Sequence, residues 1–402
     1  MSDLLSLEEA QARLLALAPA MPVVESDASA PLVRFLEHDL EARRTQPPAD
    51  LSAMDGYAIS GPVDDGAPWQ RVGESRAGAS FTGSLEPGQC TRISTGAHMP
   101  QGADRVLIQE NAAVNGDKVA LAQGQSLPPP HRHVRKRGFD FTAGETVLRQ
   151  GTLLGPAQLA LAIAAGHDTV PHRQAPRVHV LDSGDELSAV ASACTPDQIP
   201  ASNGPMIAAL LRPYIGETQR LGPVADDMDA LAQALARADG DILITSGGAS
   251  VGDHDLVQAA LTEWGADINF WRVAIKPGKP LMVATRKTGH GRQVILGLPG
   301  NPVSSFVTAF LFALPLVRAA IGDLSPLPRP VAVVVRDALP ATGKRREFLR
   351  GVSDGAQVRL AASQDSSALM ALAQANCLID RPPFSDPVSV GEPVPVYNLQ
   401  NG

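Results

Sequence analysis

The sequence is poor in cysteine. Only three cysteines occur among its 402 residues, and Cys90, Cys194 and Cys377 lie far apart with no C-x-x-C pair. This spacing offers neither a disulfide framework nor a thiolate zinc site. A reducing compartment suits such a chain, and we expect a cytoplasmic protein.

Aromatic residues are also scarce, at 4% of the chain. Proteins that stack single-stranded nucleic acid need several aromatic side chains on one face. Positive charge is outnumbered too, because 34 Lys and Arg stand against 42 Asp and Glu, which gives a net charge of −8. Both shortages argue against nucleic acid as a partner, and they predict a core of aliphatic side chains.

Long apolar runs are the third shortage. We expect no run to approach the roughly 18 apolar residues of a membrane-spanning helix. The first 17 residues carry acidic side chains among the apolar ones, which is atypical of a signal peptide. The sequence therefore predicts a soluble chain without a membrane anchor.

The pattern of apolar and polar residues changes along the chain. A Ser6 to Glu9 capping box predicts a short helix at the start. Short apolar runs broken by Gly and Pro follow, with a hairpin signal at Asn115-Gly116, and later a regular alternation of strands and amphipathic helices indicates a mainly parallel α/β sheet. The predicted parts are an N-terminal helical and linker domain (1–45 with 138–174), a β-rich inserted domain (46–137), an α/β domain (175–322) and a C-terminal β barrel (323–402).

A short basic run lies near the end of the predicted inserted domain. Pro128 to Pro130 stiffen the chain, and HRHVRKRG follows at 131–138. The run is too short to outweigh an acidic chain. We interpret it as a domain boundary or a local anion contact.

Three predicted strand ends in the α/β domain combine glycine with polar side chains. Ligands of open α/β sheets bind beyond the carboxyl ends of the strands, where helix N-termini and backbone amides hold anions. The Ser246-Gly247-Gly248 turn and Ser250 can approach a phosphate or the edge of a pterin-like ring, although a glycine loop on its own is more often a plain turn. The three segments are 182–186, 246–255 and 299–302.

Carboxylates at the same edge favour a ligand site over a plain turn. Asp182, Asp185 and Glu186 follow one predicted strand, and such a group either repels itself or holds a hard cation such as Mg²⁺. Asp226 and Asp227 could join it, although capping of the next helix is the better interpretation for this pair.

Two lysines complete the predicted chemistry. Lys276 and Lys279 flank a stiff Pro-Gly turn after a strand, and two ammonium groups suit an oxyanion or a phosphate better than a merely solvated turn. Asn301 and Ser304 would open the next helix, whose free amides add to anion binding. Cations beside a carboxylate-bound metal are what phosphoryl chemistry requires.

Seven motifs occur in a fixed order along essentially the whole chain. They are SAMDGY at 52–57, RISTGAHMPQGAD at 92–104, RGFD at 137–140, SGDE at 183–186, SGGASVG at 246–252, KPGKP at 276–280 and LPGNP at 298–302. In this order they resemble the molybdopterin molybdenumtransferases, the family of the bacterial molybdenum-insertion enzymes and of the E domain of gephyrin.

The resemblance implies a transferase, a molybdopterin molybdotransferase, that inserts molybdate into adenylylated molybdopterin and releases AMP with the help of Mg²⁺ or Zn²⁺. It further implies an elongated α/β plus β subunit, and a homodimer whose site is shared between subunits. Transient partners would be the adenylylating enzyme and the apoproteins of molybdoenzymes. A non-catalytic pterin-binding scaffold and a molybdopterin adenylyltransferase remain as alternatives.

The same resemblance implies roles for individual residues. The catalytic candidates are Asp55, Thr95, Asp140 and Glu186. The substrate-binding candidates are Asn203, Ser246, Gly247, Gly248, Ser250, Lys276, Lys279, Pro299, Pro302, Ser304, Arg350 and Ser366. The metal candidates are Glu186, Asp226, Asp227 and Asp255. Departures from the family pattern occur at Leu51, Ala249, Leu256 and Arg272.

Overall fold

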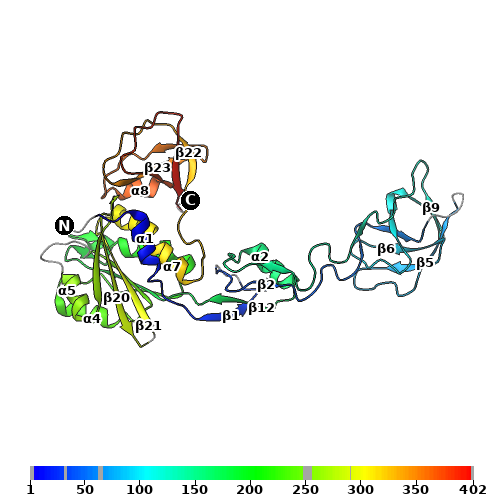
Figure 1. The fold of residues 1–402 in the computed structure, drawn as a ribbon, viewed down its shortest axis with the longest axis horizontal. Coiled ribbons are helices and arrows are strands. Elements are labelled where there is room, and N and C mark those ends of the chain that lie inside the picture. The colour runs from blue at the N-terminus through cyan, green and yellow to red at the C-terminus, as the bar shows by residue number, and fades with distance from the viewer. Residues whose placement is uncertain (1–3, 31–33, 62–66, 248–255, 290, 400–402) are drawn as a thin grey trace.

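The molecule is elongated, with most of its mass at one end. The computed structural model describes residues 4–30, 34–61, 67–247, 256–289 and 291–399. An α/β body and a barrel lie at one end, a β-rich module lies at the other, and a narrow connecting unit joins them (Figure 1). The predicted multidomain α/β plus β architecture is confirmed.

The body is built on a six-stranded sheet. Three of its strand pairings are parallel, and the two pairings that involve β20 are antiparallel. The sheet is therefore mainly parallel, as predicted. Its strands in spatial order are β16 (Thr218–Arg220), β13 (Val178–Asp182), β17 (Ile242–Ser246), β21 (Gly291–Leu298), β20 (Pro280–Thr288) and β18 (Asp267–Arg272).

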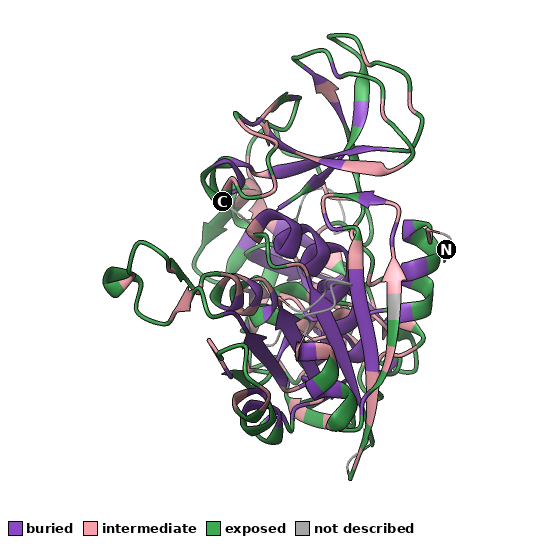
Figure 2. Cartoon of the chain, turned by 90° about the vertical axis from the view of Figure 1, so that its left-hand side faces the viewer, coloured by how far each residue is buried: buried purple, intermediate pink, exposed green. Residues whose placement is uncertain are grey.

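Helices cover both faces of this sheet. Successive residues of a strand point to opposite faces, so Val180 enters one apolar cluster and Leu181 the other. One face packs on α4 (Met228–Ala236) and α5 (Leu256–Glu263), and the other packs on α3 (Asn203–Leu211) and a long helix that begins at Pro302. Figure 2 shows the buried strands between these helices.

Among the described residues, one long helix is apolar enough over its length to resemble a membrane span. It runs through α6 (Pro302–Thr308), a π-helical segment (Ala309–Ala313) and α7 (Leu314–Ala320). Over these 19 residues its mean hydropathy of 1.7 would suit a membrane span, but 89% of the tested window is buried inside the protein. The expectation that no apolar run approaches this length was wrong, and the burial fits a core helix.

The predicted N-terminal helix is α1 (Leu7–Leu15). The Ser6 hydroxyl accepts a hydrogen bond from the Glu9 amide at 3.1 Å, as a capping box requires. Leu7 and Leu14 are buried in the same cluster as the long helix. The helix therefore packs with the α/β body, although the sequence analysis grouped it with the linker residues.

The C-terminal region forms a closed barrel of five strands. Each strand pairs with two others, which closes the ring. A two-residue strand of the body, β19 (Ile275–Lys276), pairs with β23 and ties the barrel to the body. A short helix, α8 (Leu369–Gln374), precedes β25. The barrel strands are β22 (Val331–Val335), β23 (Arg346–Ser353), β24 (Gln357–Leu360), β25 (Cys377–Arg381) and β26 (Pro393–Asn398).

The module at the far end is a second six-stranded sheet. Asn115 pairs with Lys118, so the predicted hairpin is present and its two-residue turn is Gly116-Asp117, one position later than the signal. Trp69 and Tyr57 are buried in its core. The strands in spatial order are β7 (Arg105–Ile108), β4 (Gly56–Ile59), β6 (Gln89–Ile93), β5 (Trp69–Ser75), β9 (Lys118–Leu121) and β8 (Ala112–Asn115).

The connecting unit is made of chain that runs out to the module and chain that returns. β1 (Val23–Asp27) pairs with β12 (Thr169–Arg173) over five residues, and β2 (Leu40–Glu41) pairs with β11 (Thr146–Leu148). The helix α2 (Pro156–Ala164) packs beside them. Both passages of the chain therefore lie in one narrow structure.

Candidate functional site

Residues that begin α3 and end β17 form the centre of the candidate site. The Asn203 side-chain amide donates to the Ser246 hydroxyl at 2.9 Å and to the Gly300 carbonyl at 2.7 Å. Gly247 has φ of +100°, and a Cβ there would lie 3.0 Å from the Ser183 carbonyl oxygen, so glycine is required. Asn203, Ser246 and Gly247 are thus brought together, as predicted, at the carboxyl edge of the sheet. Gly248, Ser250 and Asp255 lie outside the described residues.

The start of the long helix borders this centre. Pro299 follows β21, and Pro302 is the first residue of α6, with Ser304 buried behind it. Ser366 comes from a barrel loop, where its carbonyl accepts the Val303 amide at 3.1 Å. One helix amide that the sequence analysis assigned to anion binding is therefore used to hold the barrel loop.

Arg350 hydrogen-bonds the backbone of the barrel loop that carries Ser366. The residue is 1% exposed, and its Nη2 donates to the Ser363 and Asp365 carbonyl oxygens, each at 3.0 Å. Burial lowers the pKa of the Arg350 guanidinium. The family resemblance implies an anion-binding role for Arg350, whereas its observed contacts are with the backbone on either side of Gln364. This positioning role depends on barrel packing, which no motif reveals.

The lysine turn packs against the same helix. Gly278 has φ of +96°, and a Cβ there would lie 2.5 Å from the Thr308 methyl group. Lys276 donates to the Glu347 carboxylate of β23 at 3.1 Å, a partner that sequence reasoning missed. Lys279 is exposed and forms no ion pair with any residue that the structure describes. Of the two ammonium groups, Lys279 is the one available to an anion.

The acidic candidates lie on neighbouring loops. Glu186 is exposed beyond β13, and Asp185 accepts the Asp226 amide at 3.0 Å, which ties the two loops together. Asp227 caps α4 by accepting the Ala230 amide at 2.9 Å, as the capping interpretation expected. Within the described ranges, no group of three or more His, Cys, Asp or Glu is arranged to hold a metal ion.

Asp182 ends β13 but is buried rather than open to the site. It is 1% exposed, its Oδ2 lies 3.7 Å from the Arg220 guanidinium, and a Cβ on Gly204 would lie 2.1 Å from that oxygen. Burial raises the pKa of the Asp182 carboxyl, and Arg220 only partly opposes this. The carboxyl therefore packs under the start of α3.

We expect Asp182→Asn to stabilise the protein more as pH rises. Because folding raises this pKa, the stability that Asp182 contributes is full below about pH 4 and is lost as pH rises through the folded value. The amide does not titrate, so the urea midpoint of the variant should gain on wild type as pH rises above about 4 and through the folded pKa of Asp182. Asp354→Asn is the control, because backbone hydrogen bonds from Gln357 and Ala356 lower the pKa of Asp354, so its difference from wild type should change only below about pH 4 and stay constant above it. A constant difference for Asp182→Asn would contradict the expectation.

The other catalytic candidates lie in the module. Asp55 accepts the Thr95 amide at 2.6 Å, and this bond lowers the pKa of the Asp55 carboxyl. Arg92 lies beside them, 5.2 Å from the centre of the Tyr57 ring. Asp140 is exposed, and its amide donates to the Gln46 carbonyl oxygen at 3.0 Å. Asp55 and Thr95 form one corner of the module, which lies at the opposite end of the molecule from the body (Figure 1).

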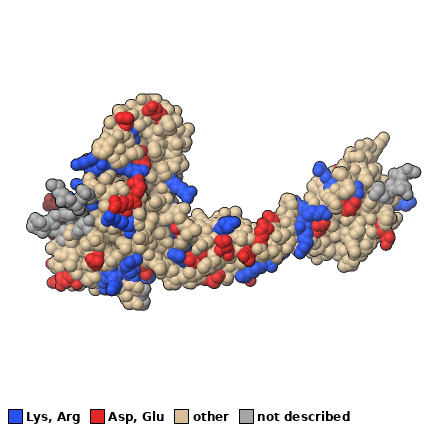
Figure 3. Space-filling view, viewed as in Figure 1, with Lys and Arg blue, Asp and Glu red and all other residues tan. Residues whose placement is uncertain are grey.

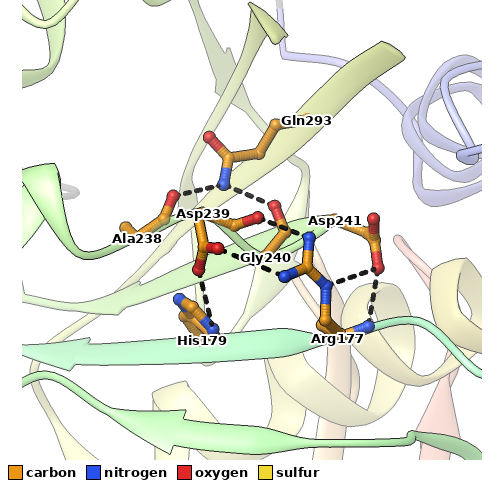
Figure 4. Close-up of polar contacts among 7 residues, drawn as sticks. All are labelled: Arg177, His179, Ala238, Asp239, Gly240, Asp241 and Gln293. Carbon is orange, nitrogen blue, oxygen red and sulfur yellow. Dashed lines mark hydrogen bonds and ion pairs between the residues drawn. The ribbon is translucent and has the colours of Figure 1, made fainter. Parts of the chain in front are cut away.

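A polar network and a hollow occupy the other edge of the body sheet. Arg177 donates to Asp239 at 3.2 Å, its amide donates to Asp241 at 2.7 Å, and His179 lies 3.8 Å from Asp239 (Figure 4). Gln293 binds the Ala238 and Gly240 carbonyl oxygens at 2.8 and 2.6 Å. An adjoining hollow of about 590 Å³ is lined partly by Arg177 and Asp241. These residues bridge the amino ends of the strands and include none of the predicted site residues.

Comparison with known proteins covers nearly the whole chain. The family described as MoeA N-terminal region (domain I and II) matches residues 5–166, a probable molybdopterin binding domain matches 179–319, and the MoeA C-terminal region (domain IV) matches 332–399. A solved structure of a molybdopterin biosynthesis MoeA protein from Pyrococcus horikoshii shares the fold, with a TM-score of 0.83, 24% identity, and coverage of 98% of this chain and 100% of that one.

Curated relatives extend over nearly the same length. A molybdopterin molybdenumtransferase from a Nostoc species is 36% identical over 91% of this chain and 86% of its own. Another from Haemophilus influenzae is 31% identical over 98% of both chains. With matching motifs, fold and full-length relatives, the chain belongs to the molybdopterin molybdenumtransferase family.

Proposed function

We propose that this protein is a transferase of molybdenum cofactor biosynthesis, which inserts molybdate into adenylylated molybdopterin and releases AMP. The observation that carries the proposal is the cluster joined by Asn203, because it places a glycine turn and a helix start side by side at the carboxyl edge of the sheet. Such an edge binds phosphates and ring edges through backbone groups. The names of the full-length relatives support the same substrate.

Each part of the site has a role in this proposal. The Asn203, Ser246 and Gly247 cluster, continued by Gly248 and Ser250, holds the pterin and its phosphate. Lys279, with Lys276 beside it, supplies positive charge for the molybdate dianion, and Ser304 and Ser366 belong to the adjoining wall. Arg350 acts through the loop that carries Ser366, whose backbone it holds.

The proposed metal is Mg²⁺, with Zn²⁺ as the alternative. Glu186 and Asp226 lie on loops that are tied together, and Asp255 would add a third carboxylate. All-oxygen ligands fit a hard cation such as Mg²⁺ better than Zn²⁺. A bound cation would neutralise charge on the phosphoanhydride of the substrate. Asp227 contributes less, because its carboxylate already caps a helix.

We also propose a cytoplasmic homodimer in which the module of one subunit completes the body site of the other. Asp55, Thr95 and Asp140 are held far from the body in one chain, so a shared site requires a second copy (Figure 1). Transient partners would be the enzyme that adenylylates molybdopterin and the apoproteins that receive the cofactor.

The test is AMP release by the purified protein from adenylylated molybdopterin. We expect release only when molybdate and Mg²⁺ are both present, together with formation of the molybdenum cofactor. Omission of molybdate and omission of the metal are the matched controls. Tight pterin binding without release would indicate the scaffold alternative, and consumption of ATP would indicate the adenylyltransferase.

A further inference from the structure

The basic run at the end of the module lies beside the Asp55 corner. β3 (Leu51–Ser52) pairs with β10 (Val134–Arg135), so the chain leading to Asp55 runs along the basic run. The Ala53 amide donates to the His133 carbonyl oxygen at 2.8 Å, two residues before Asp55. The proposed catalytic corner and the basic run therefore share one surface of the module.

The positive charge on this surface is mostly uncompensated. Asp50 forms an ion pair with Lys136 at 2.9 Å. Arg132, Arg135 and Arg137 are exposed, and none of them pairs with a carboxylate among the described residues. Figure 3 shows Lys and Arg gathered where the module meets the connecting unit. Three exposed guanidinium groups without a carboxylate partner in the described part of the chain, on and beside the strand that pairs with the chain leading to Asp55, form an anion-binding surface on a chain whose net charge is −8. The Asp50 carboxylate, which also accepts the Arg137 amide at 2.8 Å, lies within this surface.

The backbone of the run is held in an uncommon conformation. His131 and His133 have φ of 65° and 60°, in the left-handed region that residues other than glycine rarely adopt. Only one further non-glycine residue, Phe384, has positive φ within the described ranges. Such conformations persist where surrounding contacts enforce them, and they cluster at functional sites. Here the bond from Ala53 fixes the turn against the Asp55 loop, which presents Arg132 from a rigid backbone.

We propose that Arg132, Arg135 and Arg137 form a binding subsite for the pyrophosphate linkage of the adenylylated substrate. This inference rests on the proposed function, because it assigns the nucleotide end of that substrate to the module. Guanidinium groups bind phosphate oxygens through paired N–H donors, which ammonium groups cannot reproduce. The body then holds the pterin end, and the module brings its arginines together with Asp55 to the phosphoanhydride that is broken when AMP leaves.

The test compares two triple variants of the full-length protein. Arg132→Gln, Arg135→Gln and Arg137→Gln together remove the subsite. The control combines Arg237→Gln, Arg329→Gln and Lys344→Gln, three exposed cations elsewhere, so its net charge changes equally. Binding of inorganic pyrophosphate is measured by calorimetry at low and high salt, and turnover is measured as AMP release. Circular dichroism and size-exclusion chromatography verify folding of both variants.

We expect the subsite variant to bind pyrophosphate about 10- to 100-fold more weakly at low salt, and KM for adenylylated molybdopterin to rise similarly. The difference should shrink at high salt, and KM for molybdate should stay unchanged. The control should match wild type. Wild-type pyrophosphate affinity and KM in the subsite variant would overturn the inference and leave the proposed function standing. A different outcome is possible: the wild type releases no AMP, yet the subsite variant binds pyrophosphate more weakly than the wild type. That outcome would overturn the proposed function and keep the arginines as a pyrophosphate-binding subsite.

Discussion

A dimer made of one Asp55→Ala subunit and one Glu186→Ala subunit should recover about half of the wild-type rate of AMP release, although each variant alone is inactive. In the proposed shared site, the body of the first subunit would keep Glu186 and meet the intact Asp55 of the second. The other site of the same dimer lacks both groups. Co-expression with two different affinity tags isolates the mixed dimer, and molybdate-dependent AMP release per dimer is the measurement.

The controls for this experiment are the two single-variant homodimers, which should fall by about 1000-fold or more because charged groups at a reacting centre are lost. Glu186 is exposed, so its substitution should leave the urea midpoint unchanged, whereas Asp55→Ala loses the hydrogen bond from the Thr95 amide and should lower the midpoint slightly. An inactive mixed dimer would show that Asp55 and Glu186 act from one chain or not at all. Full activity of either homodimer would remove that residue from the site.

Arg350→Lys should be almost as damaging as Arg350→Ala, with AMP release reduced by about 100-fold in both. The guanidinium spans the Ser363 and Asp365 carbonyl oxygens, and a lysine ammonium cannot hold both in that geometry. Hydrogen exchange of residues 361–368 should accelerate in both variants, because the loop loses its support. If Arg350 bound molybdate through charge alone, lysine would preserve most of the activity and exchange would stay slow.

Asp365→Asn is the matched control for the arginine variants. Arg350 hydrogen-bonds the backbone carbonyl of Asp365, while the exposed Asp365 carboxylate accepts the Ser367 amide and hydroxyl and interacts with Arg350 through charge alone. The substitution should therefore leave both the exchange rates and the turnover close to wild type. This outcome separates the backbone contact from any charge effect within the same loop.

Elements with strong local periodicity were predictable. The short apolar runs of β13 and β17, which are buried at every residue, identify strands covered on both faces, and Ser6 marks the start of α1. The family was also predictable, because its motifs are short, ordered and spread over the chain.

Elements that depend on distant partners were not predictable. Ile275 and Lys276 leave the body to pair with the barrel strand β23, and nothing local indicates that. The π-helical segment at Ala309–Ala313 interrupts a pattern that is apolar on all sides, so periodicity cannot reveal it. The packing of α1 against the body likewise depends on residues about 300 positions away, such as the Leu311 carbonyl bound by Gln11.

The same limit applies to the candidate site. Glycine turns after strands located Ser246 and Gly247, because parallel strands end at one edge. The contacts of Lys276 with Glu347 and of Val303 with Ser366 arise only when the barrel packs on the body. Sequence therefore identified the residue types of the site but not which of them are already engaged.

In the connecting unit, the chain that runs out to the module pairs with the chain that returns from it, so the module is an insertion between two adjacent points of the chain. The Ala42 amide donates to the Glu145 carbonyl oxygen, and the Gly144 amide donates back to Ala42, both at 2.8 Å. The chain thus departs and returns at adjacent points, so a tight turn in place of the module would close an ordinary hairpin there. The fold of the body therefore does not depend on the module, even though the proposed shared site does.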